Sequence, residues 1–319
     1  MEYSEWDDDK FDTLIYSIRQ KNCILMLGPD VETELAVEKT KVLTEILANL
    51  LAEKIDPGIK TQINSDDLAQ VSQNYCAEKG RSDLEAKVLN FYNQRKTMTN
   101  TLHQNLAELG FYLIITTTPG NMTYEALTRK KTPIKDYYNF RGNKPENVKM
   151  GTVESPLMYY LYGSVDNAKS LLLTENDLLD FLASLISKKP PLPDNILSEF
   201  QDENKSFLFL GFGFRHWYLR ILLHALQGGH KRESLSFALE QFTPENAAEI
   251  DRNAIFFKRG DYKIHLFKEE LNRFVERLRN KYEGSDQACT SVMAPNAPEV
   301  FISYANDDQA YAMSLYRKL

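Results

Sequence analysis

Short apolar runs alternate with segments whose apolar residues recur every three or four positions along most of this chain. Runs of four to eight apolar residues between turn residues are typical of buried strands, and the wider spacing is typical of amphipathic helices. This alternation predicts an α/β domain with a doubly wound, mostly parallel sheet and helices on both faces. The expected strands are residues 23–27, 111–118, 157–162, 206–211 and 263–267, with weaker candidates at 170–173, 234–238 and 254–257.

The helical spacing predicts helices between these strands. Thr174 followed by Asp177 is an acidic variant of the capping box and predicts a helix start. The polar stretch 129–149 is rich in turn residues and is expected to be a surface excursion. The expected helices cover residues 10–20, 35–51, 66–75, 82–93, 101–109, 178–186, 217–226 and 269–282.

The pattern changes after residue 283. Residues 284–298, GSDQACTSVMAPNAP, are small and polar with two prolines, which is typical of a flexible linker. Residues 299–319 then give one apolar run, VFISY, and one helical pattern. About twenty residues cannot bury a core of their own, so we interpret this tail as the opening strand and helix of an incomplete domain. The expected organisation is an α/β domain over residues 1–283, a linker over 284–298 and the fragment 299–319.

The opening strand, Cys23–Leu27, runs directly into Gly28, Pro29 and Asp30. In open α/β sheets a turn of this kind lies at the carboxyl end of a strand, where nucleotides bind. Pro29 lacks the N–H that would hold a phosphate, and Asp30 is suited to cap a following helix itself. Asp30 and Glu32 would also bring two carboxylates close to a phosphate. The turn is therefore either an unusual nucleotide loop or the start of an ordinary capped helix.

Composition narrows the choice of partners. The 319 residues are 43% hydrophobic and carry a net charge of −7, so we expect neither nucleic-acid binding nor a membrane span. The acidic N-terminus is unlike a signal peptide, and three widely spaced cysteines are typical of a reducing compartment. We therefore expect a cytoplasmic protein without a structural metal site.

Four segments, taken in order, resemble the sirtuin-like family in the branch found in bacterial antiphage defence. NCILMLGPDV stands where that family has its glycine-rich nucleotide loop, and LIITTTPGNMTYEAL resembles its strand ending in Thr-Thr-Asn-x-Asp. LYGSVDNAKSLLLTENDLLDFL resembles its Leu-His-Gly-Ser segment, and FLFLGFGFRHWYLRILLHAL resembles its Phe-Leu-Gly strand and helix. The tail EVFISYANDDQAYAMSLYRKL resembles the opening of a TIR domain.

The chain departs from the family pattern where the chemistry is expected. The family's histidine falls on Tyr162, its asparagine on Thr118 and its following aspartate on Gly120. A tyrosine with an ordinary pKa of about 10 is a poor base at pH 7, and threonine lacks the paired donor and acceptor of an amide. We therefore name no catalytic residue. The resemblance implies that any cofactor contacts come from Gly28, Asp30, Thr116, Thr117, Gly163, Ser164 and Gly211.

Two functions are compatible with these features. In the first, a degenerate sirtuin-like domain binds no cofactor tightly, self-associates and holds C-terminal TIR domains together, and the resemblance implies that TIR domains hydrolyse NAD when clustered. In the second, the domain binds or hydrolyses NAD or an ADP-ribose derivative, with Tyr162 and Thr118 in altered roles. A variant of the second uses the pocket to sense a nucleotide or phage-derived signal. His103 is expected to be a buried packing residue in each case.

Overall fold

A computed structural model of the chain describes residues 6, 8–36, 39–142, 147–214, 216, 218–228, 230–240, 252, 255–258 and 262–292. The chain divides into two units, Met1–Arg279 and Asn280–Leu319. The first holds the sheet and nearly all described helices. The described part of the second is the carboxyl-terminal portion of one helix, α12 (Leu271–Val292).

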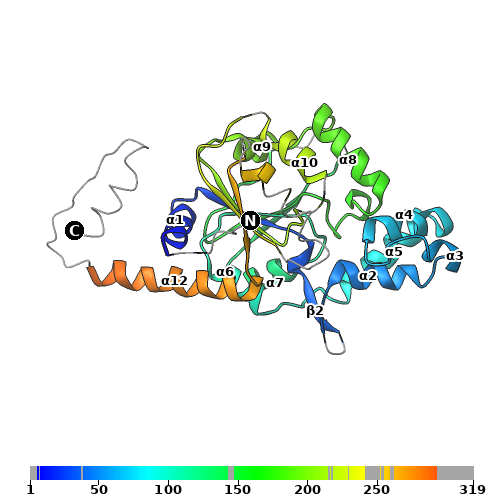
Figure 1. Ribbon diagram of the computed structural model, residues 1–319, viewed down its shortest axis with the longest axis horizontal. Helices are drawn as coiled ribbons and strands as arrows, with labels where there is room; N and C mark the ends of the chain where they lie inside the picture. The colour runs from blue at the N-terminus through cyan, green and yellow to red at the C-terminus, as the bar shows by residue number, and fades with distance from the viewer. Residues whose placement is uncertain are drawn as a thin grey trace. The chain divides into compact units, whose positions relative to one another are not determined.

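A seven-stranded sheet forms the centre of the first unit (Figure 1). Every neighbouring pair of strands runs parallel. The strand order reverses at β1: the strands β4 to β6 lie on one side of it and β7 to β9 on the other. The order is β5 (Ile134–Tyr137), β6 (Leu157–Tyr160), β4 (Leu113–Thr116), β1 (Cys23–Leu27), β7 (Ser206–Leu210), β8 (Ser236–Glu240) and β9 (Ile264–Lys268).

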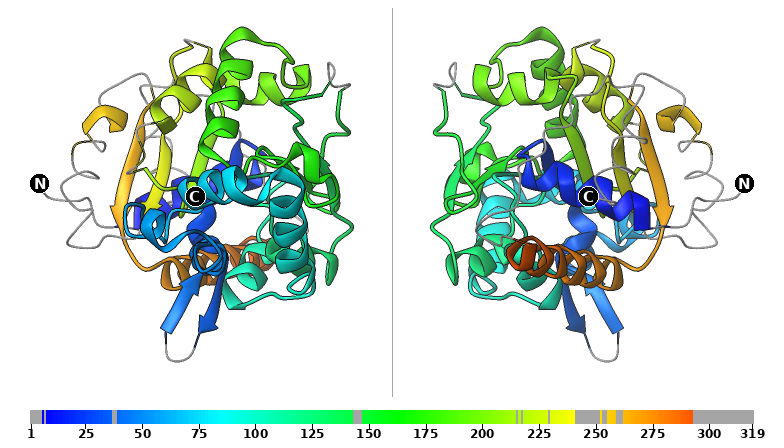
Figure 2. Two further views of the ribbon diagram at one scale, coloured as in Figure 1. Left: turned by 90° about the vertical axis from the view of Figure 1, so that its right-hand side faces the viewer. Right: turned by 90° about the vertical axis from the view of Figure 1, so that its left-hand side faces the viewer.

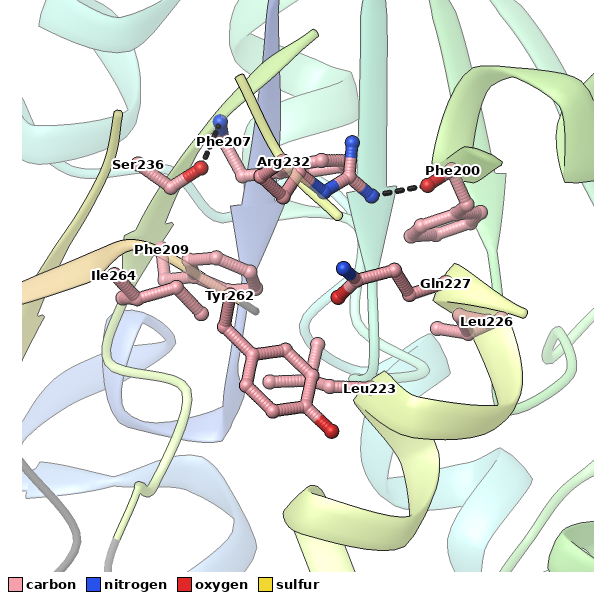
Figure 3. A pocket seen from close by; sticks show the side chains of 10 residues that line it. All are labelled: Phe200, Phe207, Phe209, Leu223, Leu226, Gln227, Arg232, Ser236, Tyr262 and Ile264. Carbon is pink, nitrogen blue, oxygen red and sulfur yellow. Dashed lines mark hydrogen bonds between the residues drawn. The ribbon is translucent and has the colours of Figure 1, made fainter. Parts of the chain in front are cut away.

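One face of the sheet packs against α8 (Glu175–Ser187), α9 (Asp194–Gln201) and α10 (Tyr218–Gln227). Phe181, Phe200 and Leu222 from these helices share one core with alternate residues of β1, β4, β6 and β7. A cavity of about 20 Å³ remains between α9, α10 and strands β7–β9 (Figure 3). Such a volume holds about one water molecule, so it is a packing defect and not a ligand site.

The opposite face is covered by α1 (Asp8–Arg19), α6 (Thr101–Glu108), α7 (Met122–Thr128) and the part of α12 up to Arg279 (Figures 1 and 2). Trp6 is the centre of an aromatic cluster there. Its ring centroid lies 5.1 Å from that of Phe11 on α1, 4.3 Å from Phe267 on β9 and 4.7 Å from Phe274 on α12. These contacts bury large apolar rings from four separate segments and join both ends of the unit.

A small helical module is inserted between β1 and β4. It begins with a hairpin, β2 (Thr33–Ala36) and β3 (Lys39–Val42), and continues with α2 (Leu43–Ala52), α3 (Pro57–Lys60), α4 (Leu68–Lys79) and α5 (Arg81–Asn93). Its core also includes Met122, Leu171 and Leu173, which follow the carboxyl ends of β4 and β6. The module therefore packs on the edge of the sheet where ligands bind in this class of fold.

The fold class predicted from the sequence is confirmed, and so are the strands at 23–27, 111–118, 157–162, 206–211, 234–238 and 263–267 within a few residues. Among the described residues, no helix combines the length and apolar character of a membrane span. Four local predictions are wrong. Residues 33–36 and 39–42 pair as two antiparallel strands, although a helix was expected from residue 35, and 171–173 form no strand. Residues 255–258 are helical, and the polar stretch 129–149 contains the edge strand β5.

Helix α12 also continues to Val292, beyond the expected end near residue 282 and into the stretch expected to be a linker. The fragment 299–319, with its TIR resemblance, lies outside the described residues. The division into a domain, a linker and a fragment therefore stays a prediction.

Candidate functional site

Gly28 and Gly211 meet where the strand order reverses, since Gly28 follows β1 and Gly211 follows β7. A Cβ atom on Gly28 would lie 2.0 Å from the carbonyl oxygen of Gly211 and 2.2 Å from the Cα of Phe212. Gly211 has a φ of +56°, and a Cβ there would lie 2.9 Å from the Cβ of Asp30. Only glycine permits this approach. The two loops therefore touch backbone to backbone at the topological switch point.

The backbone donors of the loop after β1 are all used within the chain. Pro29 has no N–H, and each of the other four residues from Gly28 to Glu32 donates to a carbonyl oxygen. A phosphate at this turn would need such N–H groups to be free. The pairs are Gly28–Leu210, Asp30–Gly211, Val31–Gly28 and Glu32–Pro29, at 3.0, 3.2, 3.5 and 3.2 Å between nitrogen and oxygen.

The prediction that Asp30 caps a long helix is wrong. Pro29–Val31 form a single 3-10 turn, and its N-cap position is held by Gly28 without a side-chain hydrogen bond. The first long helix of the module, α2, begins only at Leu43, after the hairpin. The positive end of a helix dipole is therefore missing from this turn, and with it one of the two features that hold a phosphate in nucleotide loops.

The side chain of Glu32 lies beneath the turn that follows β4. It is 3% exposed, and its Oε1 accepts a hydrogen bond of 3.4 Å from the backbone N–H of Met122. Its Oε2 is buried without a hydrogen-bond partner. A Cβ on Gly120 would lie 1.9 Å from that oxygen. The carboxylate of Glu32 thus occupies the space into which the family's aspartate would project from position 120.

Burial raises the pKa of Glu32 to about 7. The hydroxyl of Thr118 and the backbone groups of Met122 and Gly120 oppose that rise, although only the N–H of Met122 lies at hydrogen-bond geometry. Thr118 is itself buried, with its hydroxyl 3.3 Å from that of Thr116. Thr118, which aligns with the family's asparagine, therefore lies next to a carboxyl group that changes charge near neutral pH, and its hydroxyl joins it to Thr116, one of the predicted cofactor contacts.

A buried histidine lies on the other side of the same turn. His103 is fully buried, with Nε2 3.1 Å from the carbonyl oxygen of Val31 and Nδ1 2.7 Å from the hydroxyl of Thr123. Burial lowers its pKa to about 4, so the ring is neutral at pH 7. Both nitrogens are engaged, and the ring ties the loop after β1 to helix α7, which is the packing role expected from the sequence.

Tyr160 and Asn121 extend this polar cluster. The hydroxyl of Tyr160 donates to Oδ1 of Asn121 at 2.8 Å, and Nζ of Lys135 donates to the same oxygen at 3.0 Å. Lys135 also pairs with Asp166 at 2.7 Å. None of these residues was predicted from the sequence to be a site residue. The one sequence signal that could have pointed to them is Lys135 itself, which lies on the short strand β5 within the stretch that was predicted to be a surface excursion.

Tyr162 lies apart from this cluster. Beyond the end of β6 the chain turns, and the ring of Tyr162 packs edge-on against that of Phe181 on α8, with centroids 5.0 Å apart. Burial, together with the nearby Tyr218, raises the pKa of Tyr162 well above 10. The hydroxyl therefore stays protonated at neutral pH and cannot serve as a base.

The remaining predicted positions shape two turns. Gly163 has a φ of +83°, and a Cβ there would lie 2.2 Å from the carbonyl oxygen of Ser170. The backbone N–H of Ser164 donates to the hydroxyl of Ser170 at 3.0 Å. The N–H of Thr117 donates to the carbonyl oxygen of Leu27 at 3.0 Å, which ties β4 to β1. Gly28, Asp30 and Gly211 thus form one group, and Gly163 and Ser164 belong to another.

Residues 113–255 match the family model of the SIR2-like domain. The matched region begins with β4 and includes β5, β6, β7 and β8. The loop after β1 and the helical module precede it. No curated protein matches the chain. The sirtuin-like part of the predicted resemblance is therefore confirmed over this region.

Three titratable groups lie near the carboxyl edge of the sheet, and each is limited as a base. Tyr162 stays protonated, and both nitrogens of His103 are engaged in hydrogen bonds. Glu32 has a suitable pKa of about 7 but is packed against Gly120. Among the described residues, no group of three or more His, Cys, Asp and Glu side chains is arranged to hold a metal ion.

Proposed function

We propose that the SIR2-like domain of this chain is a non-catalytic assembly module of a bacterial antiphage-defence protein. It self-associates and thereby brings together the TIR domains that begin near residue 299, which then hydrolyse NAD. The defence role and the TIR partner rest on the resemblances of the sequence. The loss of NAD chemistry in the SIR2-like domain rests on the geometry of its switch point.

One observation carries this proposal: the backbone donors of the loop after β1 are consumed by Leu210, Gly211 and the loop itself. A dinucleotide would have to break these hydrogen bonds to use the donors, and each buried carbonyl oxygen that thereby loses its partner costs about 1–3 kcal/mol. The carboxyl group of Glu32, 3% exposed and with a pKa raised by burial to about 7, adds negative charge under the neighbouring turn once it ionises above that pH. Both features oppose the binding of a pyrophosphate.

The purified protein is expected to release no nicotinamide from NAD above the buffer control. The reason is that the position matching the family's histidine holds Tyr162, whose buried hydroxyl has a raised pKa. Nicotinamide release is measured by chromatography with the wild type and with Tyr162→Phe. Turnover in the wild type that disappears in Tyr162→Phe would contradict the proposal.

A second candidate function, NAD hydrolysis with Glu32 as the base, is favoured by the pKa of about 7 at that carboxyl. It is tested in the same assay with Glu32→Gln. Turnover that is abolished in Glu32→Gln and preserved in Tyr162→Phe would replace the first proposal by the second.

Light scattering is expected to show particles larger than a monomer for the full chain and for a version ending at residue 292, which keeps α12 whole. If self-association occurs through the SIR2-like domain, removing the tail leaves the number of chains in each particle unchanged. A strictly monomeric shortened protein, with a full chain that still assembles, would place the association in the tail and contradict this part of the proposal.

A further inference from the structure

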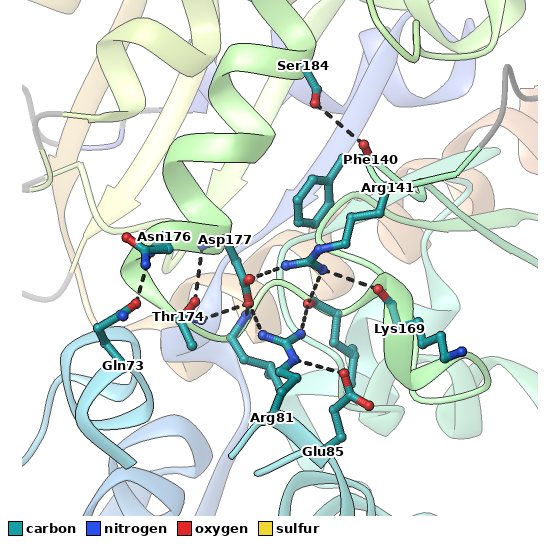
Figure 4. Close-up of polar contacts among 12 residues, drawn as sticks. Gln73, Arg81, Glu85, Phe140, Arg141, Lys169, Thr174, Asn176, Asp177 and Ser184 are labelled. Carbon is teal, nitrogen blue, oxygen red and sulfur yellow. Dashed lines mark hydrogen bonds and ion pairs between the residues drawn. The ribbon is translucent and has the colours of Figure 1, made fainter. Parts of the chain in front are cut away.

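A polar pocket of about 530 Å³ opens between the helical module and the carboxyl edge of the sheet. Its walls come from α4 and α5, from the loops after β5 and β6, and from the first turn of α8 (Figure 4). None of its lining residues belongs to the loop after β1, and none is among the positions predicted to contact a cofactor. Five of them, Asn167, Lys169, Thr174, Asn176 and Asp177, lie within the segment 161–182 that resembles the family's Leu-His-Gly-Ser segment and following helix. The volume is within the range of pockets that bind small molecules.

The pocket is positively charged in a protein of net charge −7. Three cations line it, Arg81, Arg141 and Lys169, against two acids, Glu85 and Asp177, which leaves a local charge of +1. Lys169 is exposed, and its ammonium group makes no ion pair or hydrogen bond with the described part of the chain. A cation without a partner at the rim of a concave polar site favours an anionic ligand.

The two arginines are held firmly and still have donors to offer. Nε, Nη1 and Nη2 of Arg81 donate to Glu85, Asp177 and the carbonyl oxygen of Leu171. Arg141 makes three such hydrogen bonds, to Asp177 and to the carbonyl oxygens of Lys169 and Leu171 (Figure 4). A guanidinium has five N–H donors, so each arginine keeps two for which the described residues provide no acceptor.

Side-chain amides complete the walls. Asn139 and Asn176 both line the pocket, and Gln73 of α4 accepts a hydrogen bond of 3.2 Å from the backbone N–H of Asn176. Amides carry both donors and acceptors, which suit the hydroxyl groups of a sugar or the edge of a base. Fixed guanidinium groups suit a phosphate, because they meet its oxygens without losing further side-chain freedom.

We propose that this pocket binds a phosphate-bearing small molecule of about the size of a mononucleotide, with the phosphate at Lys169 and the two arginines. The ligand would join α4 and α5 of the helical module to the sheet edge. The Asp177 carboxylate already connects these two parts, because it pairs with Arg81 on α5 and with Arg141 after β5. The site goes beyond the assembly role and does not depend on whether the loop after β1 binds NAD.

Cys76 offers a direct readout, because it lines the same pocket as a free, half-buried thiol. The full chain is alkylated with iodoacetamide, and modification of the peptide containing Cys76 is followed by mass spectrometry. The probes are AMP, ribose 5-phosphate, inorganic phosphate and adenosine, at concentrations up to about 1 mM. AMP and ribose 5-phosphate are expected to slow the modification, and adenosine is not. Tighter protection by AMP than by ribose 5-phosphate would identify a nucleotide, and equal protection a sugar phosphate.

The matched pair of variants is Lys169→Gln and Lys87→Gln, which change the net charge equally. Lys87 is exposed on α5 and does not line the pocket. Lys169→Gln is expected to weaken protection by AMP about ten-fold, as the loss of one charge-assisted hydrogen bond should, while Lys87→Gln leaves it unchanged. Protection by adenosine equal to that by AMP, an equal effect of both variants, or no protection by any phosphate compound would overturn the proposal. The NAD assay is unaffected by any of these outcomes.

Discussion

Replacing Asp177 by alanine is expected to lower the free energy of unfolding by about 2–4 kcal/mol, because it leaves two buried backbone N–H groups without an acceptor and removes the carboxylate shared by two half-exposed arginines. The Asp177 side chain accepts hydrogen bonds from Arg81 and Arg141. It also accepts from the backbone N–H groups of Leu173 and Thr174, at 2.8 and 3.0 Å. A single carboxylate thus links the helical module, the loop after β5 and the start of α8.

The measurement is urea unfolding at pH 7, with Asp180→Ala as the control. Asp180 lies on the exposed side of the same helix, so its replacement is expected to change stability by less than about 0.5 kcal/mol. An Asp177→Ala midpoint close to that of Asp180→Ala would contradict this expectation, because it would show that the N–H groups of Leu173 and Thr174 and the two arginines find water or other partners at little cost.

The stabilisation contributed by Asp177 is expected to be lost at acidic pH. Burial acts to raise the pKa of Asp177, but hydrogen bonds from Arg81, Leu173 and Thr174 outweigh it and hold the pKa below its ordinary value. The stabilisation is therefore present above the pKa of the unfolded chain, near 3.9, and is lost as the pH falls through the lower folded-state pKa. The difference between wild type and Asp177→Ala is expected to shrink only in that acidic range.

The central strands were predictable because a parallel strand that is buried on both faces must be a continuous apolar run. Cys23–Leu27 and Ser206–Leu210 are buried along their whole length and were found at those positions. The capping box at Thr174 was also predictable, since both of its hydrogen bonds are local in sequence. Edge strand β5 was not, because its four residues are only half buried and carry no such signal.

The hairpin after the opening strand escaped prediction for a different reason. Leu35 and Leu43 were read together as one helical stripe, but Leu35 is 77% exposed and only Leu43 belongs to the module's core. A single apolar residue on a two-stranded hairpin imitates the first position of a helical pattern. The error affected the predicted site in two ways. It predicted a helix start where the structure has one short 3-10 turn, and it gave no indication that Glu32 is buried.

Contacts between residues that are far apart in the sequence could not be predicted either. The resemblance aligned Tyr162 with a catalytic histidine, but the residue that reaches the buried polar cluster is Tyr160, two positions earlier. The contact of Glu32 with Gly120 joins segments 88 positions apart and has no local pattern. The sequence shows it only indirectly, because the chain differs from the family motif at both positions. Glu32 adds an acidic residue to the loop after β1, and Gly120 replaces the family's aspartate after β4.

Replacing Glu32 by glutamine is expected to stabilise the protein at pH 8, by about 3 kcal/mol, and to leave it nearly unchanged at pH 4. The pKa of Glu32 is raised by burial from 4.5 to about 7, so the folded state holds its proton where the unfolded chain has lost it. The favourable contribution of the protonated group is complete below pH 4.5 and is lost between pH 4.5 and 7. A rise of about 2.5 pH units corresponds to roughly 3 kcal/mol.

Glutamine has the shape of the protonated carboxyl group and no charge, so it removes the cost of burying a carboxylate beside Gly120. Urea midpoints of wild type and variant are measured from pH 4 to pH 8, with Glu203→Gln as the control, because Glu203 is exposed in the loop before β7. The control is expected to parallel the wild type throughout. A Glu32→Gln variant that is less stable than wild type at pH 8 would show that the ionised carboxylate is held by favourable contacts, and Glu32 would then be a carboxylate retained at the switch point for chemistry or binding.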